Sequence, residues 1–426
     1  MAALRPFRLP GFPSLSLAYL VNELGNWLGE IALAVLVFDQ TQSPLATAGL
    51  FLGMQFAPAL LAPPLTARLE HLSARAVLPA LYAAEAASFA VLALLADNFA
   101  LAAVYALATF DGSIASTARA LTRASATATL APAGQLREGN ALLNVAFTAG
   151  AAVGPALAGI LVAGAGVETA LLADAASFVA VATLLGATRR LPRPQVEAGE
   201  HGWVVRLRRG IDYVRDRPAL RRLLGAQAAA FIFFALVIPI EVVFAKETLD
   251  AGDSGYGALL ASWGAGMVIG SLVFVRLRRV ALGALLAVST AAIGAAYMGT
   301  AAAPSLLVAC GAAVIGGTGN GVQWIALVTA VQELTRATYQ ARVLALLEAL
   351  ASAMPGVGFL IGGAITAIFD PRVSYAVAGA GVLAVLALAA GLLRRAEWTV
   401  ELEQGPPDAT AATEVGRLAP KARTGP

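Results

Sequence analysis

The 426-residue sequence has few charged residues and almost no cysteine or histidine. Asp, Glu, Lys and Arg make up 13% of it, about half their share in an ordinary soluble domain. The one cysteine, Cys310, excludes an intrachain disulfide and a thiolate metal cluster. The two histidines, His71 and His201, lie far apart in the sequence and offer no metal-ligand spacing. The net charge of +3 is too small to indicate nucleic-acid binding. We therefore expect no metal, no cofactor and no nucleic-acid partner.

The motifs of common membrane enzymes are missing as well. The sequence contains no HExxH zinc motif, no Ser/His/Asp arrangement and no GxxxxGK[ST] phosphate-binding loop. The missing phosphate loop also argues against an ATPase domain in this chain. We expect a protein that is not an enzyme.

Long apolar runs dominate the sequence. Hydrophobic residues make up 59% of it, and the scarce charges form short clusters between the runs. Runs of about 20 apolar residues are typical of helices that cross a bilayer. We predict an all-α membrane protein with twelve transmembrane helices. The expected spans are 14–38, 44–66, 74–96, 99–121, 138–164, 168–188, 221–245, 254–275, 280–300, 304–330, 340–367 and 373–394.

The basic residues predict how the chain is threaded through the bilayer. Most of them lie in the two terminal segments, in the loops after even-numbered spans, or at the helix ends that flank these. Of the 29 Lys and Arg residues, only Lys246 and Arg372 fall in the opposite loops. The positive-inside rule makes the basic-rich side cytoplasmic. We predict a multi-pass protein of the cytoplasmic (inner) membrane with both termini in the cytoplasm.

The spans form two groups of six, related by an internal repeat. The predicted parts are a cytoplasmic N-terminus (1–13), a first bundle (14–188), a linker (189–220), a second bundle (221–394) and a disordered tail (395–426). Equivalent residues in the two bundles are Gly49, Arg68, Asn144, Gly154 and Gly159 with Gly257, Arg276, Glu348, Gly358 and Gly363. Duplicated halves of this kind predict two bundles related by a pseudo-twofold axis. Transporters so built bind their substrate near the midplane, between the bundles.

The linker carries a pattern of its own. Apolar residues recur there at helical spacing, and arginines fill much of the remainder. The apolar residues are Trp203, Val204, Leu207, Ile211 and Val214. This pattern fits an amphipathic helix on the anionic inner leaflet. A basic tether that simply joins the two bundles explains it equally well.

Span 1 carries polar residues at membrane depth. A carboxylate there costs ~2.5–3.5 kcal/mol on insertion scales, so its presence needs a reason. Glu23 and Glu30 are seven residues apart and share one helix face, with Asn26 between them. Such a strip must face the bundle interior or a wet cavity. We predict that the two carboxylates take part in proton coupling. The alternative is hydrogen bonding between helices.

Other spans add further candidates. Asp111 and Glu348 are predicted to take part in proton or cation coupling, although Glu348 could equally make a contact at a helix end. The substrate cavity is predicted to be lined by Asn22, Asn26, Trp27, Asn144, Asn320, Gln323 and Trp324. Glu85, Asp174 and Glu241 are weaker candidates, because the last two could simply lie near helix ends.

The sequence resembles the major facilitator superfamily over nearly its whole length, and within it the branch of macrolide-efflux and siderophore-export proteins. The stretches that carry the resemblance are LVNELGNW (20–27), SPLATAGLFLGMQFAPALLAPPLTAR (43–68), QLREGNALLNVAFTAGAAVGPALAG (135–159) and GYGALLASWGAGMVIGSL (255–272). The run GAAVGPALAG at 150–159 is similar to the antiporter motif GxxxGPxxGG, with Ala158 replacing one glycine. The resemblance implies a hinge at Gly150, Gly154, Pro155 and Gly159, with a degenerate partner at Pro355, Gly358, Gly362 and Gly363. Ordinary close packing of small residues is the alternative.

Two stretches depart from the family pattern. In the loop after span 2, Arg68 fits the family motif, but Ala67 stands where the family has the aspartate of a cytoplasmic gate. In span 4, Ala108 stands where an arginine implicated in proton transfer often sits, and Asp111 takes a glutamine position. The gate residues implied by the resemblance are Arg68, Arg75 and Arg276. These departures leave the fold expectation intact and put the family's coupling mechanism in question.

The resemblance implies a monomeric secondary transporter in membrane lipid, which exports a small amphiphilic molecule in exchange for protons by alternating access. The cargo class would be a drug, an antibiotic, a siderophore or a related metabolite. A lysolipid flippase and a non-transporting receptor on a decayed transporter fold are the alternatives.

The predicted topology can be tested by labelling cysteines placed one at a time in a Cys310→Ser background. We expect an impermeant thiol reagent to reach the connections between spans 5 and 6 and between spans 6 and 7 from opposite faces of the membrane, because one crossing separates them. Labelling of both connections from the same face would refute the topology.

Overall fold

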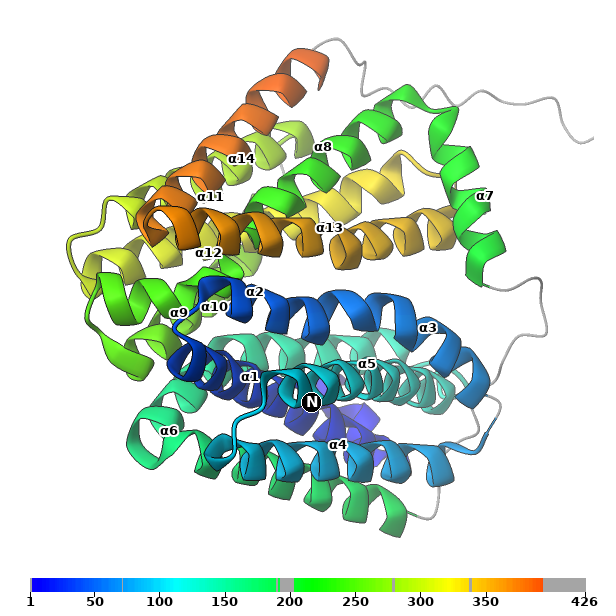
Figure 1. Cartoon of the computed structure of the whole chain (residues 1–426). Helices are drawn as coiled ribbons and strands as arrows, with labels where there is room; N and C mark the ends of the chain where they lie inside the picture. The colour runs from blue at the N-terminus through cyan, green and yellow to red at the C-terminus, as the bar shows by residue number, and fades with distance from the viewer. Residues whose placement is uncertain are drawn as a thin grey trace, which may run out of the picture.

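A computed structural model shows the chain as a bundle of long helices (Figure 1). The residues that it describes are 2–70, 72–188, 191, 203–277, 280–336 and 339–393. Within these ranges every regular element is a helix, as the sequence predicts. The predicted tail at 395–426 and the first part of the predicted linker lie outside the described residues, apart from residue 191.

The helices follow the predicted spans closely. After a short 3₁₀ segment, η1 (Ala2–Arg8), the first half contains α1 (Phe12–Thr41), α2 (Pro44–Phe51), α3 (Ala57–Leu69), α4 (Ala74–Asp97), α5 (Leu101–Leu130) and α6 (Leu136–Ala187). The second half contains α7 (Trp203–Arg215), α8 (Pro218–Ala235), α9 (Glu241–Val243), α10 (Gly252–Arg276), α11 (Leu282–Ala301), α12 (Leu306–Glu333), α13 (Gln340–Ile368) and α14 (Pro371–Leu393). A π-helical turn, η2 (Leu52–Phe56), joins α2 to α3, and the turns η3 (Ile238–Ile240) and η4 (Phe244–Thr248) flank α9.

Eleven helical stretches of the described chain are long and apolar enough to cross a membrane. This number treats α6 as one helix, but α6 is interrupted at Gly166, where φ is 85° and ψ is 164°. Glycine adopts such a conformation without the strain that a side chain would add. Each part of α6 on either side of Gly166 is itself as long as a membrane span.

The α5 helix differs most from its predicted span. The predicted span 99–121 ends near Arg119 and Arg123, but the helix continues to Leu130. Ala, Ser and Thr between these points sustain a helix without being strongly apolar, and Pro132 and Gly134 then follow in the turn. Arg119 therefore lies eleven residues inside the helix, about 16 Å from its end at 1.5 Å per residue. The expectation that this arginine belongs to a helix end was wrong.

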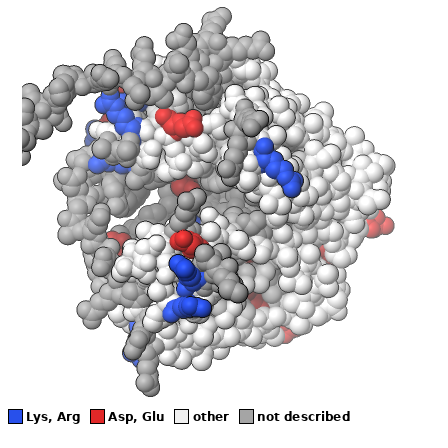
Figure 2. All heavy atoms as spheres, turned by 180° about the vertical axis from the view of Figure 1, so that it is seen from behind, with Lys and Arg blue, Asp and Glu red and all other residues white. Residues whose placement is uncertain are grey.

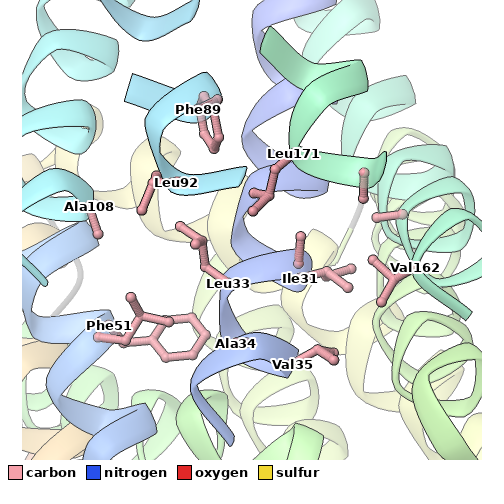
Figure 3. Close-up of a cluster of buried hydrophobic side chains, with 14 of the residues drawn as sticks. Ile31, Leu33, Ala34, Val35, Phe51, Phe89, Leu92, Ala108, Val162 and Leu171 are labelled. Carbon is pink, nitrogen blue, oxygen red and sulfur yellow. The ribbon is translucent and has the colours of Figure 1, made fainter. Parts of the chain in front are cut away.

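The α1 helix runs through the middle of the first half. In Figure 1, α1 to α6 gather in one group, while α8 and α11 to α14 gather in another. Every residue of α1 from Ile31 to Phe38 is buried. Figure 3 shows this stretch with Phe51 of α2, Leu92 of α4, and Val162 and Leu171 of α6 around it. The helix that carries the predicted polar strip is thus fixed by apolar packing on several sides.

Small residues bring the two halves together at one end of the molecule, which we call the seam end. It contains Lys246 and the C-terminal end of α1. There α6 crosses α10 so closely that a Cβ atom added to Gly159 would lie 2.7 Å from the Cα of Gly257. A Cβ on Gly363 of α13 would likewise meet Pro44 and Ala48 of α2. Helix backbones can approach this closely only at glycine, because it has no side chain to keep them apart.

Lys246 joins the halves at the same seam end. Its Nζ atom lies 2.6 Å from Oδ1 of Asp39, in α1, and 2.7 Å from Oδ1 of Asp253, in α10. The one ammonium group thus bridges the first half to the second. It is one of the two basic residues that lie apart from the basic-rich loops in the sequence.

The opposite end carries α7, and we call it the linker end. Tyr213 of α7 stacks on Tyr339, just before α13, with ring centres 4.2 Å apart. The guanidinium of Arg217 lies 3.5 Å from the centre of the Tyr213 ring. These contacts fix α7 to the second half. Figure 2 shows a hollow between the two halves on the side of the linker end, with most of the visible charged residues around it.

Replacing Lys246 with methionine is expected to loosen the seam end. Of the two ion pairs lost, only Lys246–Asp39 crosses the seam, and a partly exposed pair contributes on the order of 1 kcal/mol, so its loss would shift the populations of closed and open seams about five-fold. Spin labels at Gln42 and Glu247 in a Cys310→Ser background report the separation across the seam. We expect a longer distance population in Lys246→Met and an unchanged distribution in Lys246→Arg. Identical distributions in all three proteins would show that the ion pairs do not hold the seam.

Candidate functional site

A cavity of about 560 Å³ lies between the two halves of the molecule. The first half contributes side chains from α1, η2, α4, α5 and α6, and the second half contributes side chains from α8 to α13. Two further cavities, of about 650 and 640 Å³, are each lined by one half alone. A space of this size fits a small organic molecule.

The predicted strip on α1 faces this cavity in large part. Glu23, Asn26, Trp27 and Glu30 line it. Asn22 is different, because it is fully buried and faces away from the cavity. Its side-chain Oδ1 accepts a hydrogen bond from Asn26 Nδ2 at 3.2 Å, so the two faces of α1 are in contact through this pair.

Arg119 of α5 is the main site residue that the sequence reading missed. Its Nε atom lies 3.2 Å from Oε1 of Glu23, and their side chains are 38% and 4% exposed. Both atoms are buried and lack a well-aligned hydrogen-bond partner among the described residues, so the attraction is mainly between charges. The clue in the sequence is the weakly polar Ala/Ser/Thr stretch after Arg119, which continues the helix.

Three further carboxyl groups line the cavity. Glu30 Oε2 accepts a hydrogen bond from Gln55 Nε2, in η2, at 3.3 Å. Asp111 of α5 is buried, and its Oδ1 has no hydrogen-bond partner among the described residues. Glu241 of α9 completes the set from the second half, although the sequence reading ranked it low. The lining thus contains four carboxyl groups and, among the residues described, a single cation.

Aromatic side chains form much of the remaining wall. They come from both halves and are Trp27, Phe89, Phe147, Phe234, Tyr256, Trp263 and Tyr297. Trp263 and Tyr297 stack with ring centres 5.4 Å apart, and this contact holds both rings in place. The cavity therefore combines acidic groups with flat π surfaces.

The other predicted lining residues lie in different places. Asn320 lines the central cavity, but Gln323 lines a second cavity of about 650 Å³ within the second half. There Gln323 Nε2 donates a hydrogen bond to Thr290 Oγ1 at 2.9 Å. Trp324 packs against the apolar cluster of the second half. These placements of Gln323 and Trp324 differ from the prediction because α12 is enclosed on several sides.

The paired repeat positions lie outside the central cavity. Asn144 and Glu348 are both exposed, and neither is among the lining residues. Asn144 Oδ1 accepts a hydrogen bond from Arg123 Nη2, in α5, at 3.3 Å. Whether Glu348 takes part in coupling stays a prediction. The predicted gate residues are all exposed at helix ends: Arg68 at the end of α3, Arg75 at the start of α4 and Arg276 at the end of α10.

The glycines of the predicted hinge make two kinds of contact. A Cβ on Gly150 would lie 3.0 Å from Glu23, and one on Gly154 would lie 2.8 Å from Trp27. These two glycines therefore seat α1 against α6 within the first half. Gly159 instead contacts α10 across the seam, where the carbonyl of Pro155 also approaches Gly257. Gly154 packs behind the cavity wall and, within the described chain, does not contact the second half, so Gly159 is the better position for a test of seam movement, and the hinge role of Gly154 stays a prediction.

The partner motif in α13 divides in the same way. Pro355 lines the central cavity. Gly358 and Gly362 pack against the backbone of α8 and of Leu236, which follows it, within the second half. Gly363 faces α2 across the seam. The two motifs thus provide one seam glycine each, Gly159 and Gly363.

The Glu23–Arg119 pair gives a test of this site geometry. Arg119→Met leaves the Glu23 carboxylate unpaired and buried, which destabilises a fully buried pair by about 3–5 kcal/mol. We expect a smaller loss here, because Arg119 is partly exposed. Glu23→Gln added to Arg119→Met should restore much of the lost stability, as thermal unfolding in detergent measures. Additive effects of the two substitutions would show that the pair does not interact.

Comparison with known proteins supports this architecture. The model of the transmembrane secretion effector family, which is of the major facilitator type, matches residues 1–419. No curated protein matches the chain. Among solved structures, the nucleoside transporter NupG is similar at 14% identity and a TM-score of 0.70, covering 90% of this chain and 99% of that one.

Two other solved structures show the same fold. A bacterial homologue of the lysosomal transporter Spinster, inward-facing and occupied, has 14% identity and a TM-score of 0.70, with coverage of 90% and 96%. A bacterial homologue of the iron transporter ferroportin, in an inward-facing state, has 15% identity and a TM-score of 0.69, with coverage of 89% and 98%. Identities this low establish the fold alone. With a family match over almost its entire length, the chain belongs to the transmembrane secretion effector family of major facilitator transporters.

Proposed function

We propose that this protein is a proton-coupled exporter of a small amphiphilic molecule. The observation that carries the proposal is the central cavity, where the Glu23–Arg119 pair faces an acidic and aromatic space shared by both halves. A cavity at the junction of two such halves is where transporters of this architecture bind cargo. The family and its structural relatives are transporters, which supports a protein that is not an enzyme.

Alternating access requires two bundles that rock against each other. We infer twelve crossings, with α6 counted as two crossings that turn back at Gly166, and six crossings in each bundle. Contacts between the bundles at the seam end, together with the hollow at the linker end, support a conformation open to one side only. The positive-inside rule makes the linker end cytoplasmic. The protein would then be poised to receive cargo from the cytoplasm.

The Glu23–Arg119 pair offers a means of coupling. When Glu23 takes up a proton, its attraction for Arg119 is lost and the arginine is released into the cavity. When the proton leaves, the pair forms again. Each charge that crosses a potential of 100 mV contributes about 2.3 kcal/mol, so one or two protons per cycle can drive considerable accumulation outside. In this proposal, Arg119 with Glu23 performs the role in proton transfer of the arginine that the family often has at the position of Ala108.

The lining favours a basic aromatic cargo. Because Arg119 is paired with Glu23, each of the acidic groups Glu30, Asp111 and Glu241 that gives up its proton adds an unbalanced negative charge to the cavity. Cations are attracted both to carboxylates and to the faces of Trp and Tyr rings. The same acidic surplus repels a phosphate group and so argues against a lysophospholipid as the main cargo.

Transport by the reconstituted protein tests the proposal. Tetraphenylphosphonium, an aromatic cation whose charge does not depend on pH, is the probe. Vesicles with an acidic interior and a clamped membrane potential should accumulate it, and an uncoupler should abolish the accumulation. The double variant Glu23→Gln/Glu30→Gln should lose at least nine-tenths of the gradient-driven uptake, on the order of a ten-fold loss. It should still insert and fold, because both substitutions are uncharged and similar in size.

The control variant is Asp97→Asn, which removes an exposed carboxylate at the end of α4. We expect it to transport as the wild type does. Unchanged uptake by the double variant would refute the role of the two glutamates. No flux by the wild type in any gradient would favour a non-transporting protein.

A further inference from the structure

The face of α1 that is turned away from the central cavity also contacts polar side chains. It consists of Asn22, Gly25 and Gly29, all of them buried. Opposite this face lie the carboxyl groups of Glu85, from α4, and Asp174, from the second part of α6. Both residues are 0% exposed, and neither lines the central cavity. The sequence reading ranked both as weak candidates.

The structure holds these two carboxyl groups in defined positions. Asn22 Nδ2 donates a hydrogen bond to Glu85 Oε2 at 3.3 Å. Gly25 and Gly29 leave a groove in α1 that receives Asp174, since a Cβ on Gly29 would lie 3.1 Å from Asp174 Oδ2 and one on Gly25 would collide with Asp174 Oδ1. Ser177 Oγ donates to Asp174 Oδ1 at 3.3 Å. The groove shows that α1 and α6 are shaped around the acid.

Each carboxyl group also has an oxygen without a partner. Glu85 Oε1 and Asp174 Oδ2 are buried and accept no hydrogen bond within the described chain, and the same holds for Asp111 Oδ1. An unpaired carboxylate oxygen in a dry interior is costly, whereas a protonated carboxyl group is neutral there. The unpartnered oxygens therefore point to a proton as the ligand of this cluster.

The surrounding charges cannot neutralise the cluster. Asp111 and Asp174 both act electrostatically on Glu85, and Arg119 is the cation in range. Arg119 already pairs with Glu23 of α1. Tyr82 of α4 is a further titratable neighbour in the described chain, and its hydroxyl shares a hydrogen bond of 3.1 Å with Thr122. Three carboxyl groups near one engaged cation cannot all be ionised together.

We propose that Glu85 and Asp174 form a proton-binding site that is separate from the cargo cavity. This inference rests on the proposed function, because it assigns a site to a second transported proton, in addition to the one that Glu23 takes up. Asp111 links the two sites, since it lines the cavity and also interacts with both buried acids. A proton from cavity water binds a carboxylate oxygen of Asp111 and passes to Glu85 or Asp174. It leaves by the same route when the cavity opens to the other side, so no charge is created or lost.

The alternative is that the two acids stay permanently neutral and act only as hydrogen-bonding groups between helices. Infrared spectroscopy of the purified full-length protein in vesicles separates the two cases, because the carbonyl stretch of a protonated carboxyl group is distinct from that of a carboxylate. We expect bands of buried carboxyl groups that disappear as pH rises from mildly acidic to mildly alkaline. Glu85→Gln and Asp174→Asn should each remove part of this change, while Asp97→Asn should leave it intact. Buried bands that are the same at every pH would overturn the proposal.

A second measurement ties the site to transport. Binding of tetraphenylphosphonium to the wild type in weakly buffered solution should release protons, and Glu85→Gln should release about one proton fewer per bound probe. Because Glu85 does not contact the cavity, the affinity of Glu85→Gln for the probe at alkaline pH should stay within about three-fold of the wild type. Equal proton release by Glu85→Gln, Asp174→Asn and the wild type would overturn the assignment. If the wild type binds no probe, the proposed cargo class fails, and the infrared titration still decides whether the cluster exchanges protons.

Discussion

The cost of placing a charge in hydrocarbon governs the arrangement of this protein. In the sequence, nearly all arginines fall in the segments that the positive-inside rule predicts to lie on one side of the membrane, where water and lipid headgroups can reach them. The exceptions are informative. Arg119 lies deep within α5, and it faces Glu23 in a cavity rather than lipid. Carboxyl groups at similar depth either line the same cavity or are buried against α1. For Arg119 and the five acidic residues Glu23, Glu30, Glu85, Asp111 and Asp174, the structure provides a partner, a cavity or a reason for protonation.

Glycine makes this arrangement possible in a membrane. Lipid is as apolar as the helix surfaces, so there is little hydrophobic driving force between helices and close packing must hold them together. Gly150 and Gly154 let α6 approach the cavity face of α1, and Gly25 and Gly29 let Asp174 approach the opposite face. Close packing on both faces fixes α1 between the central cavity and the two buried acids, Glu85 and Asp174. At the seam, Gly159 and Gly257 bring the two halves into backbone contact. Such a backbone contact holds the seam closed, and few side chains need to be rearranged when the seam opens.

Much of the fold could be predicted from the sequence, because hydropathy determines which segments can cross a bilayer. The predicted spans agree with the helices to within a few residues except at the end of α5. That exception concealed Arg119, since a weakly polar helix can continue beyond the apolar run. Helical spacing correctly placed Glu23 and Glu30 on one face with Asn26. It could not show what lies opposite a face, and therefore it did not indicate that Gln323 lines a different cavity, that Glu241 lines the central one or that Glu85 lies against Asn22.

The position of α1 gives a physical reason for coupling the two proposed sites, which lie on its opposite faces. Its cavity face carries Glu23 and Glu30, and its other face carries Asn22, which holds Glu85. Asn26 and Asn22 are hydrogen-bonded across the helix surface, so a change on one face is felt on the other. A cargo that displaces α1 by a fraction of an ångström would alter the tight fit of Asp174 against Gly25 and Gly29. Packed interiors respond to such shifts by changing state rather than by deforming gradually. Under this proposal, cargo and proton need not compete for one residue, because α1 contacts both proposed sites.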